Sequence, residues 1–267
     1  MSLPGPATRA HETFADVRAA QGLAPVDLLL QNCRLVNVCS REIHPADIAI
    51  RGSKVLGIRE KFSGPAVRTI DVASDYAVPA FVQLYRGFES SALSGVTTWV
   101  VEQEGSCPVS ANDEANTHHA RRVQAPSFSR HLGNHQVCTA VAEAITAIRG
   151  GATVFLAESP QGPSLAALLA EIRGRGIDAS RLCICLPEDG AASAFVRAAL
   201  ANSFSAPEIF QLLTLNSARH FALDHEIGSI APGRKADIIL AKSLDPFLPV
   251  SIIFDGQLVL HEGHPCA

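Results

Sequence analysis

The chain has 267 residues, of which 47% are hydrophobic, and its 22 basic and 26 acidic side chains leave a net charge of −4 at pH 7. This composition supports one or two globular units with a core, and it lacks the basic excess that a nucleic-acid partner requires. No run reaches the roughly 18 apolar residues of a membrane helix and the N-terminus has no apolar signal centre, so we expect a soluble, cytoplasmic chain without a membrane partner.

The first part of the chain carries a strand pattern behind an irregular start. Residues 1–25 contain several Pro and Gly residues and no sustained periodicity, which predicts a tail or a short accessory helix. From Val26 onward, apolar residues alternate in runs on either side of Gly52-Ser53, which favours antiparallel hairpin strands. The apolar run at 76–85 does not alternate, so we expect it to be buried on both faces, as in a parallel strand.

The middle of the chain alternates between strand and helix patterns. Residues 104–136 are polar, are broken by Pro and Gly, and are too irregular to assign. Thr139 is expected to cap the next helix, and Ser205-Ala206-Pro207-Glu208 fits a capping box. The expected elements are a strand at 95–103, a helix at 139–148, a strand at 152–158, a helix at 164–176, a strand at 181–186, and helices at 191–201 and 208–221.

The C-terminal part returns to strands. Alternating runs surround a turn at Pro232-Gly233 and a hairpin turn at Asp255-Gly256. Strands at both ends with β/α alternation between them indicate an α/β fold. The expected organisation is a tail at 1–25, a small composite β-sandwich domain built from 26–78 and 227–262, and a β/α body at 79–226.

The cysteines carry little functional signal. There are seven and no C-x-x-C pair, which argues against disulfides and a zinc ribbon in a chain that should keep its thiols reduced. Cys183 and Cys185 share one face of an expected strand, where core packing explains them better than thiolate chemistry.

Several segments together resemble a known family. YAVPAFVQLYRGFESS occupies the place of a first barrel-strand motif, GVTTWVVEQE resembles a second strand, and GNHQ with the following helix and strand resembles a stretch that carries an S-D-H-E motif. The pattern Thr214, Asn216, Ala218 and Phe221, followed by Gly228 and Asp237, resembles a last helix and its return to the β unit. In this order and spacing, the chain resembles the amidohydrolase superfamily and, within it, the adenine deaminases.

The resemblance implies a (β/α)₈ barrel with its active site at the C-terminal ends of the strands. There a divalent metal (Mn, Fe or Zn) activates water for hydrolytic removal of the amino group of a purine base, because free water is a poor nucleophile at pH 7. Histidine and carboxylate ligands hold such a metal and leave one position open.

Most of the residues that the family uses are replaced. Tyr85 and Gly87 stand at the H-x-H positions, although the motif that follows survives around Glu89. The family's D-P-H-E is replaced by the residues at 102–105, and Pro187 stands where a catalytic aspartate is expected. The resemblance leaves, as candidates, His135, Glu102 and Glu104 for the metal, Glu188 and Asp189 for catalysis, and Glu89 for substrate contact.

Each candidate also has a structural interpretation. His135 can be a polar loop residue that has lost its role. His118, His119 and His131 suggest a relocated site, but a merely polar loop also accounts for them, and Glu102 and Glu104 can be solvated carboxylates at a strand end. Glu89 can make a structural hydrogen bond instead of contacting substrate.

Length also bears on the mechanism. The body has 226 − 79 + 1 = 148 residues, whereas a closed eight-stranded barrel usually takes about 200 or more. We therefore expect a truncated or incomplete barrel, whose open strand edges are covered by the 104–136 segment, by a second copy in a homo-oligomer, or by a partner subunit.

Three hypotheses follow. The first is an adenine deaminase-like amidohydrolase whose activity is lost or weakened. The second is an active hydrolase with a metal site rebuilt from Glu102, Glu104, His135, Glu188 and Asp189. The third is a non-catalytic binding or assembly partner of a full-length relative, which would hold no metal.

Overall fold

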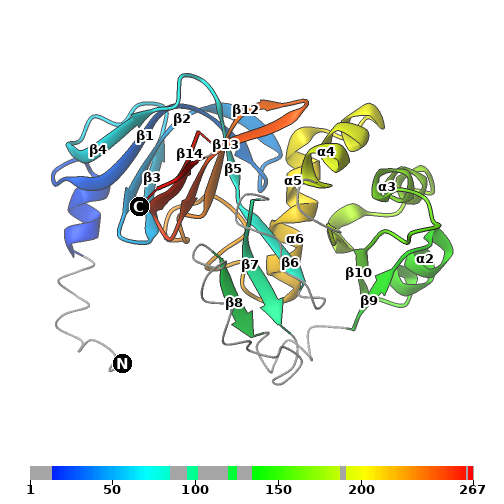
Figure 1. The fold of residues 1–267 in the computed structure, drawn as a ribbon. Coiled ribbons are helices and arrows are strands. Elements are labelled where there is room, and N and C mark those ends of the chain that lie inside the picture. The colour runs from blue at the N-terminus through cyan, green and yellow to red at the C-terminus, as the bar shows by residue number, and fades with distance from the viewer. Residues whose placement is uncertain are drawn as a thin grey trace.

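The structure is a computed structural model, and it describes residues 14–84, 95–101, 120–124, 134–186, 191–262 and 264–266. A large curved sheet lies on one side and a group of short parallel strands and helices on the other (Figure 1). Residues 14–20 form a short helix that buries Ala19 against the large sheet, so the expected tail is partly helical. Across the described ranges, no helix has the length and apolar character needed to cross a membrane.

The large sheet joins strands from both ends of the chain. Its central connection is β5, which pairs in parallel with β1 and antiparallel with β12, so that Val78 lies opposite Ile239. The order is β15-β14-β13-β12-β5-β1-β2-β3, with β4 paired to β1. The strands are β1 (Val26–Asn37), β2 (Glu42–Arg51), β3 (Lys54–Arg59), β4 (Ala66–Asp71), β5 (Tyr76–Pro79), β12 (Ile238–Leu244), β13 (Phe247–Phe254), β14 (Gln257–His261) and β15 (His264–Pro265).

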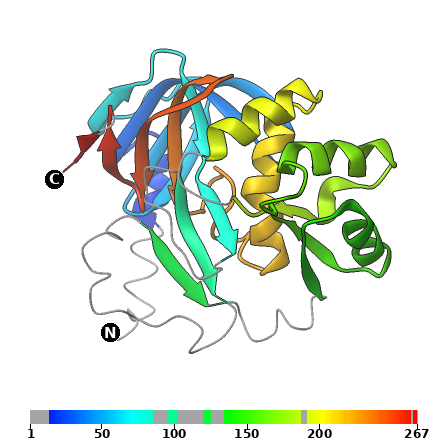
Figure 2. The same cartoon turned by 45° about the vertical axis from the view of Figure 1, so that its right-hand side comes forward.

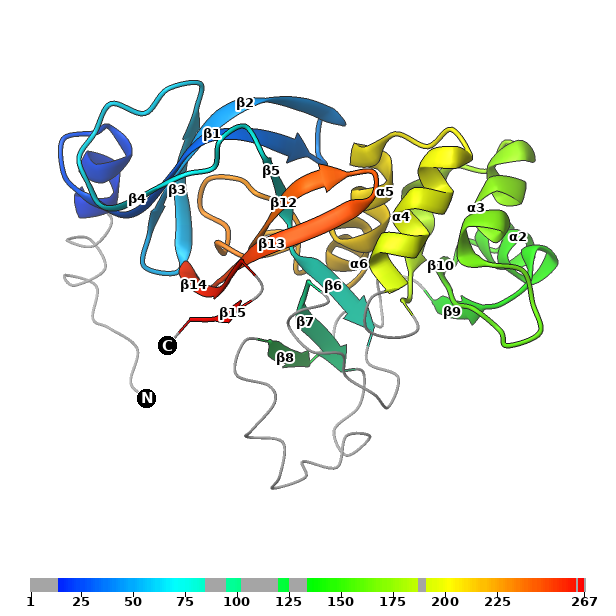
Figure 3. The ribbon, with the colours of Figure 1, turned by 45° about the horizontal axis from the view of Figure 1, so that its top comes forward.

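These strands form one continuous hydrogen-bonded sheet, not the two separate sheets that a sandwich implies. The sheet curls so that β1 and β2 and the C-terminal strands enclose a common core (Figure 3), to which Leu30, Ile48 and Ile238 contribute. The turns expected at Gly52-Ser53 and Asp255-Gly256 are confirmed, since they join β2 to β3 and β13 to β14.

Six short strands form two parallel sheets. The first has the order β6-β7-β8 and the second β11-β10-β9. The side chain of Gln83 on β6 links the two, because its Oε1 accepts a hydrogen bond at 3.0 Å from the backbone N–H of Leu186 beyond β11. The bounds are β6 (Phe81–Leu84), β7 (Val96–Val101), β8 (Arg121–Gln124), β9 (His135–Cys138), β10 (Thr153–Leu156) and β11 (Leu182–Ile184).

Helices cover the second parallel sheet (Figures 1 and 2). They are α2 (Val141–Arg149), α3 (Leu165–Gly174), the 3₁₀ helix η4 (Ala179–Arg181), α4 (Ala191–Ala201), α5 (Ala206–Leu213) and α6 (Leu215–His220). Alternate residues of the strands face opposite ways: Val154 joins the core shared with α3, whereas Phe155 packs in the cluster that contains Phe221 after α6. Burial on both faces explains the mostly apolar sequences of β10 and β11.

Tertiary contacts change several expected elements. The run at 76–85 is divided between β5 and β6, because the N–H of Ala80 bonds to the carbonyl of Asp237 at 3.1 Å as the chain passes between the sheets. The helix expected at 208–221 breaks at Thr214 (φ −133°, ψ −80°), and its hydroxyl donates to the carbonyl of Phe210. Thr139 does not cap α2, whose N-cap residue is Ala140. The capping box between Ser205 and Glu208 is confirmed.

Candidate functional site

Two histidines meet at the junction of the second parallel sheet and α6. His135 is the first residue of β9, where it lies opposite Thr153, and His220 is the last residue of α6. Nε2 of His220 lies 3.1 Å from Nδ1 of His135, with the rings inclined at 80°. One ring nitrogen must donate and the other accept, so at most one of the two rings is a positively charged imidazolium.

Aromatic rings surround this pair. The ring of Phe155 lies 5.4 Å from that of His135 and 5.7 Å from that of His220, and the ring of Phe221 lies 4.7 Å from that of His220. Burial lowers the pKa of His220 from 6.5 to about 4, and the neighbouring His135 lowers it further in the same direction. His220 is therefore neutral near pH 7 and available as a hydrogen-bond partner.

The position of His135 differs from that of a barrel active site. It begins β9, level with the start of β10, whereas the catalytic groups of β/α barrels lie beyond the C-terminal ends of the strands. At those ends, β9, β10 and β11 finish at the apolar or thiol side chains of Cys138, Leu156 and Ile184. His135 therefore lies at the N-terminal end of these parallel strands, opposite the C-terminal end that barrel enzymes use.

The other predicted site residues lie outside the described residues. They are Glu89, Glu102, Glu104, Glu188 and Asp189, together with His118, His119 and His131. Their roles stay predictions. Cys183 and Cys185 are buried in the core cluster with Phe155, as expected from their pattern.

The described residues do not by themselves fit a divalent metal. In that part of the chain no three His, Cys, Asp or Glu side chains are grouped so that they could hold one, whereas a catalytic zinc site takes three protein ligands. His135 and His220 together supply two such side chains, one fewer than that number.

A second polar group connects β8 to the large sheet. The guanidinium of Arg121 binds both carboxylate oxygens of Asp237, at 2.5 and 2.9 Å, and reaches Asp255 at 3.0 Å. Lys235 binds the same oxygen of Asp255 at 2.9 Å. Burial raises the pKa of Asp237, and the charge of Arg121 opposes this effect. The group has the character of a structural ion pair.

Sequence reasoning missed His220 and Arg121. His220 stands within the recognised pattern of the last helix, but its partner is 85 residues away and no local spacing indicates the pair. Arg121 lies in the segment that was too irregular to assign, although its partner Asp237 belongs to the recognised pattern.

Comparison with known proteins agrees with this architecture. Adenine deaminase 3 of Rhizobium meliloti (strain 1021) is 35% identical over 134 residues, which cover 47% of this chain and 22% of that protein. An adenine deaminase of Clostridium botulinum (strain Loch Maree / Type A3) is 23% identical over 353 aligned residues, with 91% of this chain and 59% of that protein covered. The chain thus spans less than two thirds of the length of these relatives.

Solved structures show the fold. A β-aspartyl dipeptidase from Fervidobacterium islandicum AW-1 superposes with a TM-score of 0.68 at 15% identity, covering 90% of this chain and 98% of that one. An adenosine deaminase of similar fold, from Xanthomonas campestris, is described with bound zinc. The fold is accordingly of the TIM-like barrel type with mixed α/β content. A model of the Amidohydrolase family matches residues 109–259, more than half of the sequence, and the chain therefore belongs to the amidohydrolase family.

Proposed function

We propose that this chain is an adenine deaminase-like amidohydrolase in which hydrolytic deamination of a purine base is lost or severely weakened. The observation that carries the proposal is the place of His135, the one candidate ligand within the described residues. It lies at the start of β9, away from the C-terminal strand ends at which barrel enzymes place their catalytic groups. In the described residues no three His, Cys, Asp or Glu side chains are grouped to hold a metal, and a catalytic zinc takes three protein ligands.

Sequence replacements support the same proposal. A tyrosine and a glycine stand at the H-x-H positions, Tyr85 and Gly87, and a glycine side chain cannot coordinate a metal. Pro187 stands at the position of the catalytic aspartate and offers no carboxylate to move a proton. Without a metal-bound water and a proton acceptor, attack on the purine ring loses both of its main accelerating groups.

We also propose the domain organisation that accompanies this loss: a composite β domain from 26–78 and 227–262, and an incomplete barrel body at 79–226. The alignment with the Clostridium relative has 353 positions but contains 91% of this chain, about 243 residues, so about 353 − 243 = 110 residues of the relative have no counterpart in the aligned part of this chain. Six parallel strands in the described residues, in two sheets linked by Gln83, are consistent with a barrel that has lost strands.

Conversion of adenine to hypoxanthine, measured with added Mn²⁺, Fe²⁺ or Zn²⁺, tests the proposal. We expect no metal-dependent rate above that of the His135→Ala variant, and no stoichiometric metal in the purified protein. A metal-dependent rate that His135→Ala abolishes and His225→Ala leaves intact would overturn the proposal. It would favour the alternative site built from Glu102, Glu104, His135, Glu188 and Asp189.

A second candidate function is assembly with another copy of the chain. The outer edges of β8 and β9 pair with no other strand in the described part of the molecule, and Val137 on β9 is 39% exposed. Unpaired edges with apolar side chains are sites of strand addition. Native mass measurement should find a homo-oligomer that Val137→Lys weakens and Leu248→Lys, on the internal strand β13, does not. A monomeric wild-type protein contradicts this function.

A further inference from the structure

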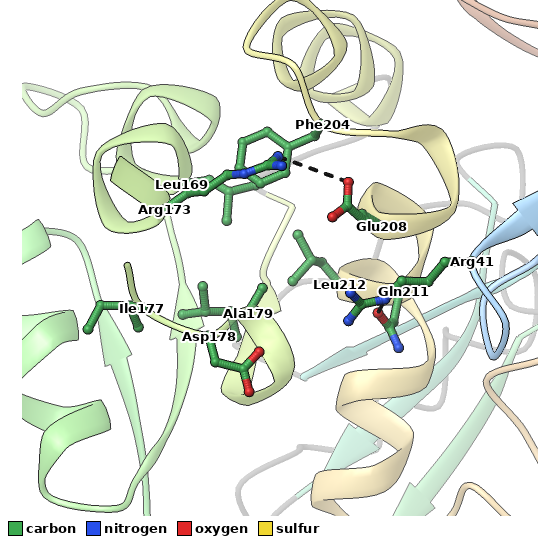
Figure 4. Close-up of a pocket in the computed structure, with 11 residues that line it drawn as sticks. Arg41, Leu169, Arg173, Ile177, Asp178, Ala179, Phe204, Glu208, Gln211 and Leu212 are labelled. Carbon is green, nitrogen blue, oxygen red and sulfur yellow. Dashed lines mark hydrogen bonds and ion pairs between the residues drawn. The ribbon is translucent and has the colours of Figure 1, made fainter. Parts of the chain in front are cut away.

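A small cavity lies where the large sheet meets the helices (Figure 4). Its volume is about 200 Å³, and its walls come from the β1–β2 turn, α3, η4 and α5. Arg41 on the turn reaches across to α5, where its Nε donates to Oε1 of Gln211 at 3.0 Å. Because η4 precedes β11, the cavity lies at the N-terminal end of that strand, away from the end that barrel enzymes use for catalysis.

Two guanidinium groups line the cavity. Within the described residues, the side chain of Arg41 makes a single hydrogen bond, through Nε, so its two terminal nitrogens remain available as a fork of donors. Arg173 is held over the ring of Phe204 at 4.4 Å and donates from one terminal nitrogen to the carbonyl of Ser203. Arg41 is thus the group best placed to bind a carboxylate in bidentate fashion.

Two carboxylates face the same space. Both carboxylate oxygens of Asp178, at the start of η4, accept hydrogen bonds, one from the backbone N–H and one from the hydroxyl of Ser180. Glu208 accepts from the backbone and the hydroxyl of Ser205 through Oε2 alone, which leaves Oε1 without a hydrogen bond in the described part of the chain. Burial works to raise the pKa of Glu208, but the Ser205 bonds and the charges of Arg173 and Arg41 outweigh it and lower the pKa, so Glu208 is charged at neutral pH.

The floor of the cavity is apolar. Leu169, Leu182 and Leu212 are all nearly fully buried and line it together. Since two arginines face two carboxylates, the charges of the wall sum to zero, and a simple anion such as phosphate gains no net attraction. The volume is also below the roughly 300 Å³ at which pockets for larger ligands begin.

We propose that this cavity binds a single zwitterionic amino acid with an aliphatic side chain. Its carboxylate would lie against the free fork of Arg41, its ammonium against Oε1 of Glu208, and its side chain on the leucine floor. A ligand in this place contacts both the turn of the large sheet and α5, so it also stabilises the junction between them. The proposal is independent of catalysis, because it uses none of the candidate catalytic residues.

Isothermal titration of the full chain with L-leucine, 4-methylpentanoate and 3-methylbutylamine tests the proposal. The second compound lacks the ammonium group and the third lacks the carboxylate. We expect L-leucine to bind about tenfold or more tightly than either, since each lost charged hydrogen bond costs about 1.5 kcal/mol or more. Equal binding of all three compounds, or no heat with L-leucine, overturns the proposal.

Variants locate the binding. Arg41→Ala and Glu208→Gln should each weaken L-leucine about tenfold, and the glutamine can still accept the backbone bond from Ser205. Ala179→Leu should block the ligand by filling the space while keeping every charge. Arg175→Ala is the control, since Arg175 pairs with Glu171 on the exposed face of α3. L-leucine binding that survives both Arg41→Ala and Ala179→Leu contradicts the assignment.

Discussion

The imidazole of His220 lies 3.1 Å from that of His135, so the end of α6 and the start of β9 share one hydrogen bond across 85 residues of sequence. The two rings are enclosed by Phe155 and Phe221, and burial there disfavours a positive charge on His220. The stability of the packing of α6 against the strands therefore depends on pH, because protonation of His220 would place a charge in this buried position.

Acid should destabilise the protein through His220. Its pKa is about 4 in the folded state and about 6.5 when unfolded, so between these values the unfolded chain binds more protons and stability falls as the pH falls. We expect the free energy of unfolding to drop by on the order of 2 kcal/mol from pH 7 to pH 4, after allowing for residual solvent screening of the ring. Urea titrations across this range measure it.

The control for this pH dependence is His225, an exposed histidine just beyond α6. His220→Phe should flatten the loss of stability between pH 6.5 and pH 4 relative to the wild-type protein, whereas His225→Phe should leave it unchanged. Identical slopes in wild type and His220→Phe would falsify the assignment to His220.

The ion pair between Arg121 and Asp237 should matter more than the surface pairs. Asp237 is 8% exposed, and removing its partner leaves a buried carboxylate without a compensating charge. Arg121→Met is expected to lower the free energy of unfolding by about 3 kcal/mol. Arg175→Met removes an exposed pair with Glu171 on α3 and should cost less than about 0.5 kcal/mol. Chemical denaturation compares the two variants, and equal losses would contradict a special role for Arg121.

Local chemistry is what the sequence predicts well. The turns at Gly52-Ser53 and Asp255-Gly256 and the capping box at Ser205 all occur as expected, because each depends on residues within a few positions of one another. The resemblance to a family was equally readable, since it rests on ordered motifs along the whole chain, and the family match confirms it.

Features set by distant contacts were not predictable. β8 and β9 have four residues each, and their sequences are too short and polar to indicate a strand. They become strands because their backbones pair with β7 and β10. The break at Thr214 and the pair of His220 with His135 likewise arise only when the helix packs on the strands. The candidate site was therefore identified at His135 but not at its partner.

The reactivity of the thiols should follow burial. Burial raises the pKa of Cys33 to about 12, with the charges of Asp47 and Asp71 acting in the same direction, and burial also raises the pKa of Cys183. Cys39 is exposed on the β1–β2 turn. In a thiol titration of the folded protein at pH 8, Cys39→Ser should remove one fast-reacting group, whereas Cys33→Ser and Cys183→Ser should remove none. A fast thiol lost in either buried variant would contradict this order.

The turn at Gly256 should be among the least tolerant positions of the large sheet. A Cβ added there would lie 2.0 Å from the carbonyl oxygen of Gly52, because the β13–β14 turn packs on the β2–β3 turn. Gly256 also has a positive φ of 79°, which an alanine adopts only with strain.

The matched control is Gly233. It has a positive φ of 86° but nothing within 4 Å of its added Cβ, so Gly233→Ala measures the backbone strain alone. We expect about 1 kcal/mol of destabilisation for Gly233→Ala and on the order of 3 kcal/mol for Gly256→Ala, because the second change must also separate the two turns. Thermal and urea unfolding give both values, and equal losses in the two variants would show that the contact between the turns does not constrain the sheet.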